Sequence, residues 1–251
     1  MVEKIKMKNE KGSHVGMILS FVIFITFTVF IYTVITPNVD TAESKKTLLN
    51  EIGLALIKNM SSEFTSLSVN IPATSNPSTN CISLEGILFY AEISPNVIVR
   101  NSAQIGQPTY YDPATDFNNL RINRISRTDL FLKIYSSPEF AKLSTSTIPS
   151  CSIVPFDGGY KIGSLNSGQY IFEKNMYSLA GQYKLNYNGL KTELKISPGN
   201  EFGFEFTLSN GTKITAMNDL PTQNIYAEDL PVQYIDGNAN ILSGFINIKV
   251  W

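Results

Sequence analysis

The sequence predicts a mainly β protein with a helical N-terminal anchor. We expect a transmembrane helix that continues into an amphipathic helix, followed by an extracytoplasmic antiparallel β-sandwich-like domain. Three observations lead to this prediction. An apolar run without a charged residue extends from Val15 to Ile35, and a stripe of apolar residues with helical spacing follows it. The rest of the chain alternates apolar and polar residues in short stretches separated by Gly, Asn and Pro, which is typical of β-sandwiches.

The N-terminal apolar run is long enough to cross a membrane. At a rise of about 1.5 Å per residue it extends about 31 Å, close to the hydrocarbon thickness of a bilayer. Its short hydroxyl side chains can bond to a carbonyl one turn earlier, so lipid tolerates them. We therefore predict a basic tail over residues 1–14 and a transmembrane helix over residues 15–36, with the lipid bilayer as partner. Pro37 is expected to end or kink this helix.

The charges on either side of the run predict its orientation. Lysines dominate the tail, whereas Asp40 and Glu43 follow the run; the tail lysines are Lys4, Lys6, Lys8 and Lys11. The positive-inside rule then places the N-terminus in the cytoplasm and the C-terminal domain outside the cell. A cleaved secretory signal is an alternative, but the apolar core of such a signal is only about 7–15 residues long.

The first 36 residues carry a resemblance to a known family. The stretch KNEKGSHVGMILSFVIFITF has a basic tail, a Lys-Gly junction and then an apolar helix. It resembles the class III signal of archaeal type IV pilin-like proteins. The resemblance implies that a prepilin-type peptidase cuts between Gly12 and Ser13 and leaves the helix on the mature protein. The sequence departs from the family at Met17, where the pilin pattern usually has a glutamate. An uncleaved signal anchor is the plain alternative.

Residues 37–69 are predicted to form an amphipathic stalk helix. Apolar residues recur at every fourth position, at Leu48, Ile52, Leu56, Met60 and Phe64. Gly53 and Pro37 mark points where this long helix could bend. A membrane helix followed by an amphipathic one is also the arrangement that the pilin resemblance implies. Residues 70–80 are predicted to be a linker because they contain two prolines and no charged residue.

Residues 81–251 are predicted to form the extracytoplasmic β-rich domain. From Cys151 onward we expect strands and turns throughout, including strands at GQYKLNY and LKTELKIS. The clearest hairpin is FGFEFTLSNGTKITAM, in which three alternate phenylalanines share a face and Asn210-Gly211 predicts a type I′ turn. A second hairpin is expected to turn near Asp236-Gly237 and to end in a C-terminal strand.

The two cysteines, Cys81 and Cys151, are candidates for one disulfide. Both lie on the side of the membrane where disulfides persist. A bond between them would close a loop of about 70 residues and contribute about 4 kcal/mol in the chain-entropy model. Two buried free thiols are the alternative.

Charge and histidine content disfavour several functional classes. The net charge is −1, and the densest basic cluster, Arg121, Arg124 and Arg127, is interpreted as a solvated face, so no nucleic-acid partner is expected. The only histidine, His14, lies at the membrane boundary. The outer domain therefore has no Ser-His-Asp triad, Cys-His pair or histidine metal ligand. Paired carboxylates such as Asp112 and Asp116 remain open. We predict that the protein is not an enzyme and holds no metal or cofactor.

Two further motifs lie in the outer part. The spacing Asp236-x-Asn238-x-Asn240 is the opening of a calcium loop, but the later ligands are absent, so a hairpin turn explains it better. Asn59-Met-Ser and Asn210-Gly-Thr are N-glycosylation sequons.

The sequence as a whole favours a single-pass membrane protein with a structural or adhesive role at the cell surface. It could be a pilin-like filament subunit that associates with itself or with other surface or pilus proteins. The alternative is a membrane-tethered ligand-binding or accessory module of a transport or secretion system.

Overall fold

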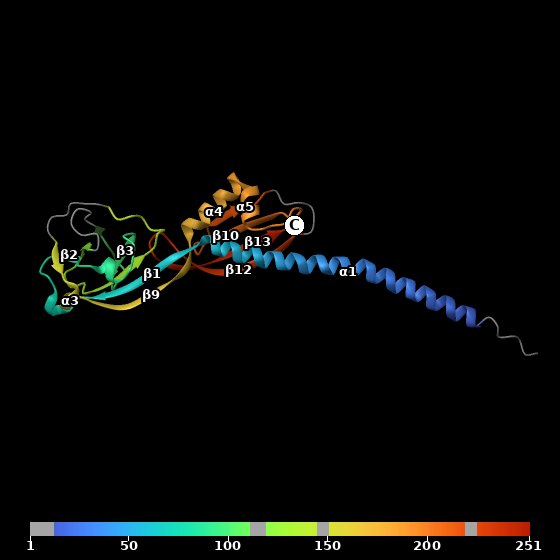
Figure 1. The fold of residues 1–251 in the computed structure, drawn as a ribbon, viewed down its shortest axis with the longest axis horizontal. Helices are drawn as coiled ribbons and strands as arrows, with labels where there is room; N and C mark the ends of the chain where they lie inside the picture. The colour runs from blue at the N-terminus through green and yellow to red at the C-terminus, as the bar shows by residue number, and fades with distance from the viewer. Residues whose placement is uncertain (1–12, 111–118, 145–150, 219–224) are drawn as a thin grey trace, which may run out of the picture.

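The computed structural model describes residues 13–110, 119–144, 151–218 and 225–251, without the side chains of Ser13 and of residues 35–42. One long helix projects from an elongated, β-rich head (Figure 1). The mainly β class predicted from the sequence is confirmed. We call the half of the head nearer to the projecting helix the proximal half, and the other the distal half.

The long helix α1 spans Ser13–Met60. Its N-terminal part, His14–Val34, is the one described helix that is long and apolar enough to cross a membrane, and it is exposed along its whole length. Hydroxyl groups in this part donate to carbonyls of the preceding turn, as from Thr28 to Phe24. Pro37 does not end the helix, contrary to one of the two outcomes predicted for it. A proline removes a single helical hydrogen bond, and the turns on both sides keep theirs.

The predicted stalk helix is wrong over residues 61–69. α1 ends at Met60, and strand β1, Ser61–Asn70, begins at the next residue. Up to Met60 the apolar stripe lies against the head as predicted. Beyond it, Thr65, Leu67 and Val69 are buried with strand spacing. Ser, Thr and Val, which make up most of β1, are weaker helix formers than the Leu, Lys and Glu that are frequent near the end of α1. β1 also gains a partner strand on each side.

A nine-stranded sheet runs the length of the head in the order β11-β10-β13-β12-β9-β1-β7-β3-β4. Its pairings are antiparallel except for a short parallel one between β12 and β9. The bounds of the strands other than β1 are β3 Val97–Asn101, β4 Gly106–Gln107, β7 Phe131–Ser136, β9 Lys161–Phe172, β10 Phe202–Thr207, β11 Lys213–Ala216, β12 Tyr226–Ile235 and β13 Ile241–Val250.

A second, four-stranded sheet lies in the distal half, in the order β5-β6-β2-β8. It also contains one parallel pair, between β2 and β8, so both sheets are mixed rather than purely antiparallel. Its strands are β2 Cys81–Leu84, β5 Thr109–Tyr110, β6 Leu120–Asn123 and β8 Ser152–Val154. Side chains from both sheets share one core, which includes Leu67, Ile134, Ile82 and Leu84. The sandwich-like packing predicted for the whole domain is found in this half.

The proximal half instead packs helices on one face of the sheet (Figure 1). The end of α1 packs there together with α4, Glu173–Leu185, and α5, Tyr187–Glu193. The prediction of strands at GQYKLNY and LKTELKIS is therefore wrong for most of these residues. Met176, Leu179, Ala180 and Tyr183 are buried at helical spacing, whereas a strand would place neighbours such as Leu179 and Ala180 on opposite faces.

Both predicted C-terminal hairpins are present, as β10–β11 and β12–β13. Phe202, Phe204 and Phe206 are buried on one face. The first turn differs in type from the predicted one. Gly211 has a φ of +82°, while Asn210 is absent from the residues with positive φ, and a type I′ turn needs positive φ at both central positions.

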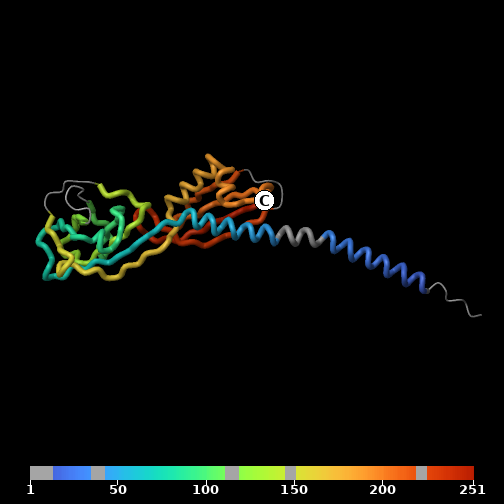
Figure 2. The backbone as a smooth tube through the Cα atoms, in the orientation of Figure 1, coloured from blue at the N-terminus to red at the C-terminus, as the bar shows by residue number. Residues whose placement is uncertain are grey.

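A hydrophobic cluster joins the two halves, and we call it the junction: Phe64, Phe140, Phe172, Ile235 and Ala239. The ring of Phe64 has four aromatic neighbours at centroid distances of 5.3 to 6.3 Å. The tip of the β12–β13 hairpin reaches the outer face of the distal sheet here, where Arg100 donates to the carbonyl of Asn238 and, at 3.0 Å, to Oδ1 of Asn240. The continuous tube in Figure 2 shows β1 and β9 crossing between the halves.

The segment predicted as a linker, residues 70–80, is part of the head. Ile71 is completely buried in the distal core, and a 3₁₀ turn, η1, follows at Ala73–Ser75. The segment connects two strands of different sheets, β1 and β2, rather than a stalk and a domain.

Candidate functional site

The end of the head farthest from α1 carries an exposed aromatic patch, which we call the aromatic tip: Phe89, Tyr90 and Phe156. Their side chains are 67%, 52% and 38% exposed. They come from two four-residue segments, α2, Ile87–Tyr90, and α3, Phe156–Gly159, and α3 marks this end in Figure 1. The rings of Tyr90 and Phe156 stack at a centroid distance of 4.0 Å, and Phe89 meets Tyr90 edge-on at 5.6 Å.

The aromatic tip is supported from behind by a buried, hydrogen-bonded tyrosine. Tyr160 is buried behind it and donates from its hydroxyl to the carbonyl of Glu85 at 2.7 Å. Burial, together with the nearby Tyr90 and Glu85, raises the pKa of Tyr160 well above its usual value, so the hydroxyl stays a donor. Gly86, with a φ of +69°, turns the chain into α2. An open aromatic surface of this kind suits contact with another macromolecule better than enclosure of a small substrate.

The predicted disulfide between Cys81 and Cys151 is present, with the two Cα atoms 4.7 Å apart. It ties the start of β2 to the residue before β8, and these two strands pair directly, with Ile82 opposite Ser152. The disulfide thus closes a covalent loop whose two ends are 70 residues apart in sequence, next to the short sheet that supports the aromatic tip. The loop consists of residues 81–151, whose described strands belong to the distal half, so the loss of freedom in the unfolded chain mainly stabilises this half of the head.

Arg124 is not on a solvated face, contrary to the prediction for the Arg121–Arg127 cluster. Its side chain is 1% exposed. It donates at 2.8 Å to Oδ1 of Asn76 and at 2.9 Å to the carbonyl of Thr79. Burial lowers the pKa of its guanidinium, and the nearby Asp129 opposes that shift. Arg124 therefore holds the 70–80 segment in place from inside the head, where a buried cation needs several acceptors.

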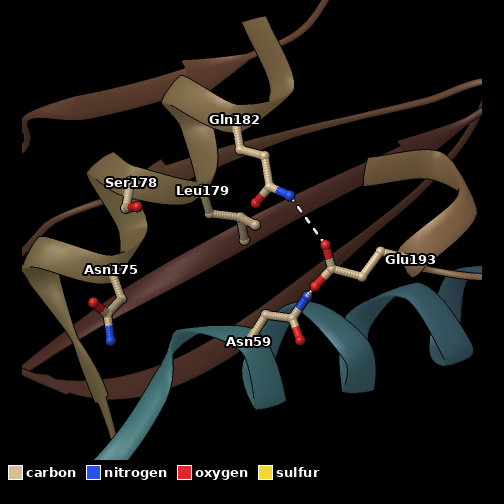
Figure 3. A pocket seen from close by; sticks show the side chains of 6 residues that line it. All are labelled: Asn59, Asn175, Ser178, Leu179, Gln182 and Glu193. Carbon is tan, nitrogen blue, oxygen red and sulfur yellow. Dashed lines mark hydrogen bonds between the residues drawn. The ribbon is translucent and has the colours of Figure 1, made fainter. Parts of the chain in front are cut away.

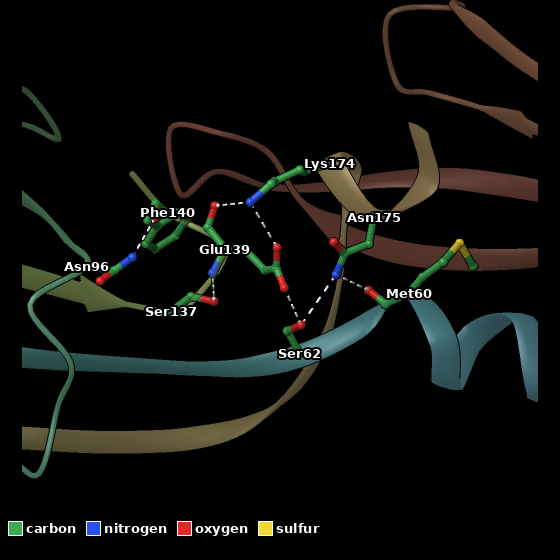
Figure 4. Close-up of polar contacts among 8 residues, drawn as sticks. All are labelled: Met60, Ser62, Asn96, Ser137, Glu139, Phe140, Lys174 and Asn175. Atoms are coloured by element: carbon green, nitrogen blue, oxygen red, sulfur yellow. Dashed lines mark hydrogen bonds and ion pairs between the residues drawn. The ribbon is translucent and has the colours of Figure 1, made fainter. Parts of the chain in front are cut away.

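A polar network closes the junction on one side (Figure 4). Ser62 donates to Oε1 of Glu139 at 2.7 Å, and Nζ of Lys174 lies 3.3 Å from Oε2. Asn175 donates to the carbonyl of Met60 and to Oγ of Ser62. Burial by itself would raise the pKa of Glu139, but hydrogen bonds from Ser62, Asn175 and Lys174 outweigh it and lower the pKa. The network fixes the point where α1 becomes β1 against α4.

A polar cavity of about 190 Å³ lies between α1, α4 and α5 (Figure 3). Asn59 donates to Oε1 of Glu193 at 2.8 Å, and Gln182 donates to Oε2 at 3.0 Å. Two amides thus hold both oxygens of this carboxylate. The remaining lining of Asn175, Ser178 and Leu179 offers a hydroxyl and a small apolar surface, which is compatible with a small polar solute.

The residues predicted from motifs occupy separate places. Gly12 lies outside the described residues, and Ser13 is the first residue of α1. Asn210 is exposed in the β10–β11 turn, far in sequence from Asn59 at the end of α1. Asp112 and Asp116 lie outside the described residues.

The Asp236-x-Asn238-x-Asn240 motif stabilises the turn between β12 and β13 through hydrogen bonds among its own residues. The Asp236 carboxylate accepts from both asparagine backbone amides and from Nδ2 of Asn240. Within the described parts of the chain, no three His, Cys, Asp or Glu side chains gather in a group that could hold a metal ion.

Sequence reasoning missed the aromatic tip and the junction network, because each joins residues from distant segments. One signal for the tip was available. Phe89 and Tyr90 are adjacent, and in a strand of the predicted β-rich domain they would point to opposite faces, which leaves one ring outside the core. In the structure these two residues belong to the short helix α2 instead.

Compared with models of known protein families, with curated proteins and with solved structures, the chain matches none of them. The resemblance to pilin-like proteins therefore rests on the sequence pattern of the N-terminal segment.

Proposed function

We propose that this protein is a single-pass, membrane-anchored cell-surface protein with a structural or adhesive role. In this proposal the N-terminal half of α1 crosses the membrane, the N-terminus is cytoplasmic, and the head lies outside the cell. The observation that carries the proposal is the continuity of α1. One helix begins as an exposed apolar span at His14–Val34 and ends at Met60 inside the core of the head.

The geometry of α1 sets the distance between membrane and head. The first described contact of the head with α1 after the span is at Lys45, whose Nζ donates to Oδ1 of Asn200 at 2.6 Å. Val34 and Lys45 are 11 residues apart, which is about 16 Å of helix. The head thus stands off the hydrocarbon region, and its long axis carries the aromatic tip farther away (Figure 1). Such a shape suits display of a contact surface at a distance from the cell.

A pilin-like filament subunit is the more specific form of this proposal. Its support is the class III signal pattern up to Ser13 and the packing of the end of α1 on the strands of the proximal half. Met17, in place of the glutamate that the pilin pattern usually has, is the feature that this form of the proposal must accommodate.

A second candidate is a tethered binding module of a transport or secretion system. The observation that favours it is the polar cavity around Glu193.

N-terminal sequencing and intact mass of the protein from native membranes test the anchor. A chain that starts at Ser13 supports the pilin-like form and makes filament imaging the next step. A chain that starts at Met1 or Val2 supports a plain anchored protein. A start at residue 38 or beyond means a cleaved signal and contradicts the proposed anchor.

Adhesion to surfaces or to other cells tests the role of the aromatic tip. We expect the double variant Phe89→Ser/Tyr90→Ser to reduce adhesion of cells that display the protein, with surface level and circular dichroism unchanged. Tyr177→Ser is the matched control, because Tyr177 is a 49% exposed aromatic residue on α4 in the proximal half. Equal adhesion of the parent and the double variant would contradict an adhesive tip.

A further inference from the structure

The two N-glycosylation sequons, Asn210-Gly-Thr and Asn59-Met-Ser, have different surroundings in the fold. Asn210 lies exposed in the β10–β11 turn, and Thr212 is exposed beside it. Oδ1 of Asn210 accepts a hydrogen bond from the backbone amide of Thr212 at 2.9 Å. Within the described parts of the chain, Nδ2 of Asn210 makes no hydrogen bond. N-glycosylation attaches the sugar to Nδ2. In this sequon, the atom that would receive the sugar is therefore not held by another described residue.

The turn that holds Asn210 is fixed from behind. Leu208 is buried, and the backbone amide of Ser209 donates to the hydroxyl of buried Tyr234 at 3.1 Å. Gly211, with a φ of +82°, closes the turn and has no side chain to obstruct its neighbours. A Cβ at Gly211 would meet nothing within 4 Å, so the space around the sequon is open.

All three residues of the other sequon are engaged in the fold. Asn59 is also exposed, but its Nδ2 is engaged, since it donates to Oε1 of Glu193 at 2.8 Å. Met60 is completely buried, and Oγ of Ser61 donates to the carbonyl of Ile57 at 2.7 Å. Modification of Asn59 would therefore break the contact between α1 and α5 at the polar cavity (Figure 3).

We propose that Asn210 is an N-glycosylation site of the folded protein and that folding protects Asn59. The glycan donor is an oligosaccharide linked through phosphate to a lipid carrier. A bond forms between Nδ2 of Asn210 and the anomeric carbon of the first sugar, while the bond from that carbon to the phosphate oxygen breaks. The lipid phosphate leaves with the bonding electrons, and the amide proton passes to a base of the transferase. In the cell this inference rests on the proposed exterior location of the head.

Glycosylation in vitro tests the site independently of the host. The full-length protein in detergent is treated with a purified oligosaccharyltransferase and a lipid-linked oligosaccharide, with an enzyme that modifies both sequons as isolated peptides. We expect one glycan, located on Asn210 by mass spectrometry. Asn210→Gln and Thr212→Ala should abolish the mass increase, and Asn59→Gln should keep it. No glycan on Asn210, or a glycan on Asn59 of the folded protein, would overturn the inference.

A separate measurement distinguishes this inference from the proposed function. Protease added outside intact cells should digest the head if it lies outside. A head that is outside but resists modification at Asn210 in vitro overturns only the site. A head protected from protease overturns the proposed location, whatever the result in vitro.

Discussion

At the scale of single residues, two polar side chains in the interior of the head connect distant segments: Arg124, which is buried, and Glu139, which is half-buried. Arg124 donates hydrogen bonds to Asn76 and Thr79. Glu139 accepts one from Ser62 and forms an ion pair with Lys174. A buried donor or acceptor that loses its partner costs about 1–3 kcal/mol, so such residues act as structural anchors.

Arg124→Ala should lower the free energy of unfolding by about 3 kcal/mol, because it leaves buried acceptors of the 70–80 segment unpaired. Urea-induced unfolding of the full chain in detergent measures the change. Arg127→Ala is the control, since Arg127 is exposed and, among the described residues, its side chain donates to one carbonyl, that of Ser78. This substitution should cost less than about 1 kcal/mol. Similar effects of the two substitutions would show that Arg124 is not an anchor.

The lowered pKa of Glu139 predicts that the free energy of unfolding depends on pH. Its pKa is lowered in the folded state, so its contribution is complete above the ordinary glutamate pKa of about 4.3. That contribution is lost as the pH falls below this value and through the folded-state pKa.

Glu139→Gln should therefore lower stability at pH 7 by about 1–2 kcal/mol and reduce the further loss between pH 6 and pH 3. Urea midpoints across this range measure both effects. Glu51→Gln, at an exposed position on α1, is the control. An unchanged pH profile in Glu139→Gln would contradict a role for this carboxylate. Some acid sensitivity should remain, because hydrogen bonds from Lys191 and from Lys213 lower the pKa of Glu201 and of Glu205 respectively.

At the scale of elements, α1 and β1 form one continuous support for the head. The helix packs on β12 and β13, and the strand lies between β9 and β7 in the large sheet. Gly53, expected from the sequence to be a bend point, is instead the site of close approach between α1 and the sheet. A Cβ there would lie 2.7 Å from Cδ1 of Leu230 and 3.2 Å from Cδ1 of Ile248.

Gly53→Val should destabilise the head by about 1–3 kcal/mol, because the added methyl groups overpack the contact between α1 and the sheet. Gly181→Val on α4 is the matched control, since a Cβ there meets nothing within 4 Å. It should change stability by about 0.5 kcal/mol or less. Thermal unfolding followed by circular dichroism compares the two variants. Equal stability of both would argue against close packing at Gly53.

At the scale of the whole molecule, the junction connects two differently built halves. The proximal half packs helices on a sheet and the distal half packs sheet on sheet, with separate cores. The strands β1 and β9 and the cluster around Phe64 connect them. For the proposed role at the cell surface, this connection would hold the far end of the head at a set distance from the membrane.

Phe64→Ala should cost about 3–5 kcal/mol and separate the unfolding of the two halves. Hydrogen exchange followed by mass spectrometry should show one cooperative unit in the parent. In the variant, β2 and β7 should exchange at a different rate from β10 and β13. Phe131→Ala is the control, because Phe131 is 38% exposed at the start of β7. A single cooperative unit in Phe64→Ala would mean that the halves are coupled by other contacts.

The sequence by itself determined the features that depend on a few neighbouring residues. The apolar span, the helical stripe up to Met60 and the two C-terminal hairpins follow from local periodicity and turn residues. The sequence also named the partners of the disulfide, Cys81 and Cys151, because two cysteines allow one intramolecular bond. That this bond forms, rather than two free thiols, is shown by the structure.

Only the tertiary structure decided where α1 ends, that α4 and α5 are helices, and that Arg124 is buried. The aromatic tip likewise joins α2 and α3, which are far apart in the chain. The physical reason is the same in each case. A strand such as β1 is stabilised by partners 60 or more residues away, β7 and β9, so its residues have no local signal that outweighs their fit to a helix. Burial of a charge depends equally on which distant carbonyls the fold brings to it.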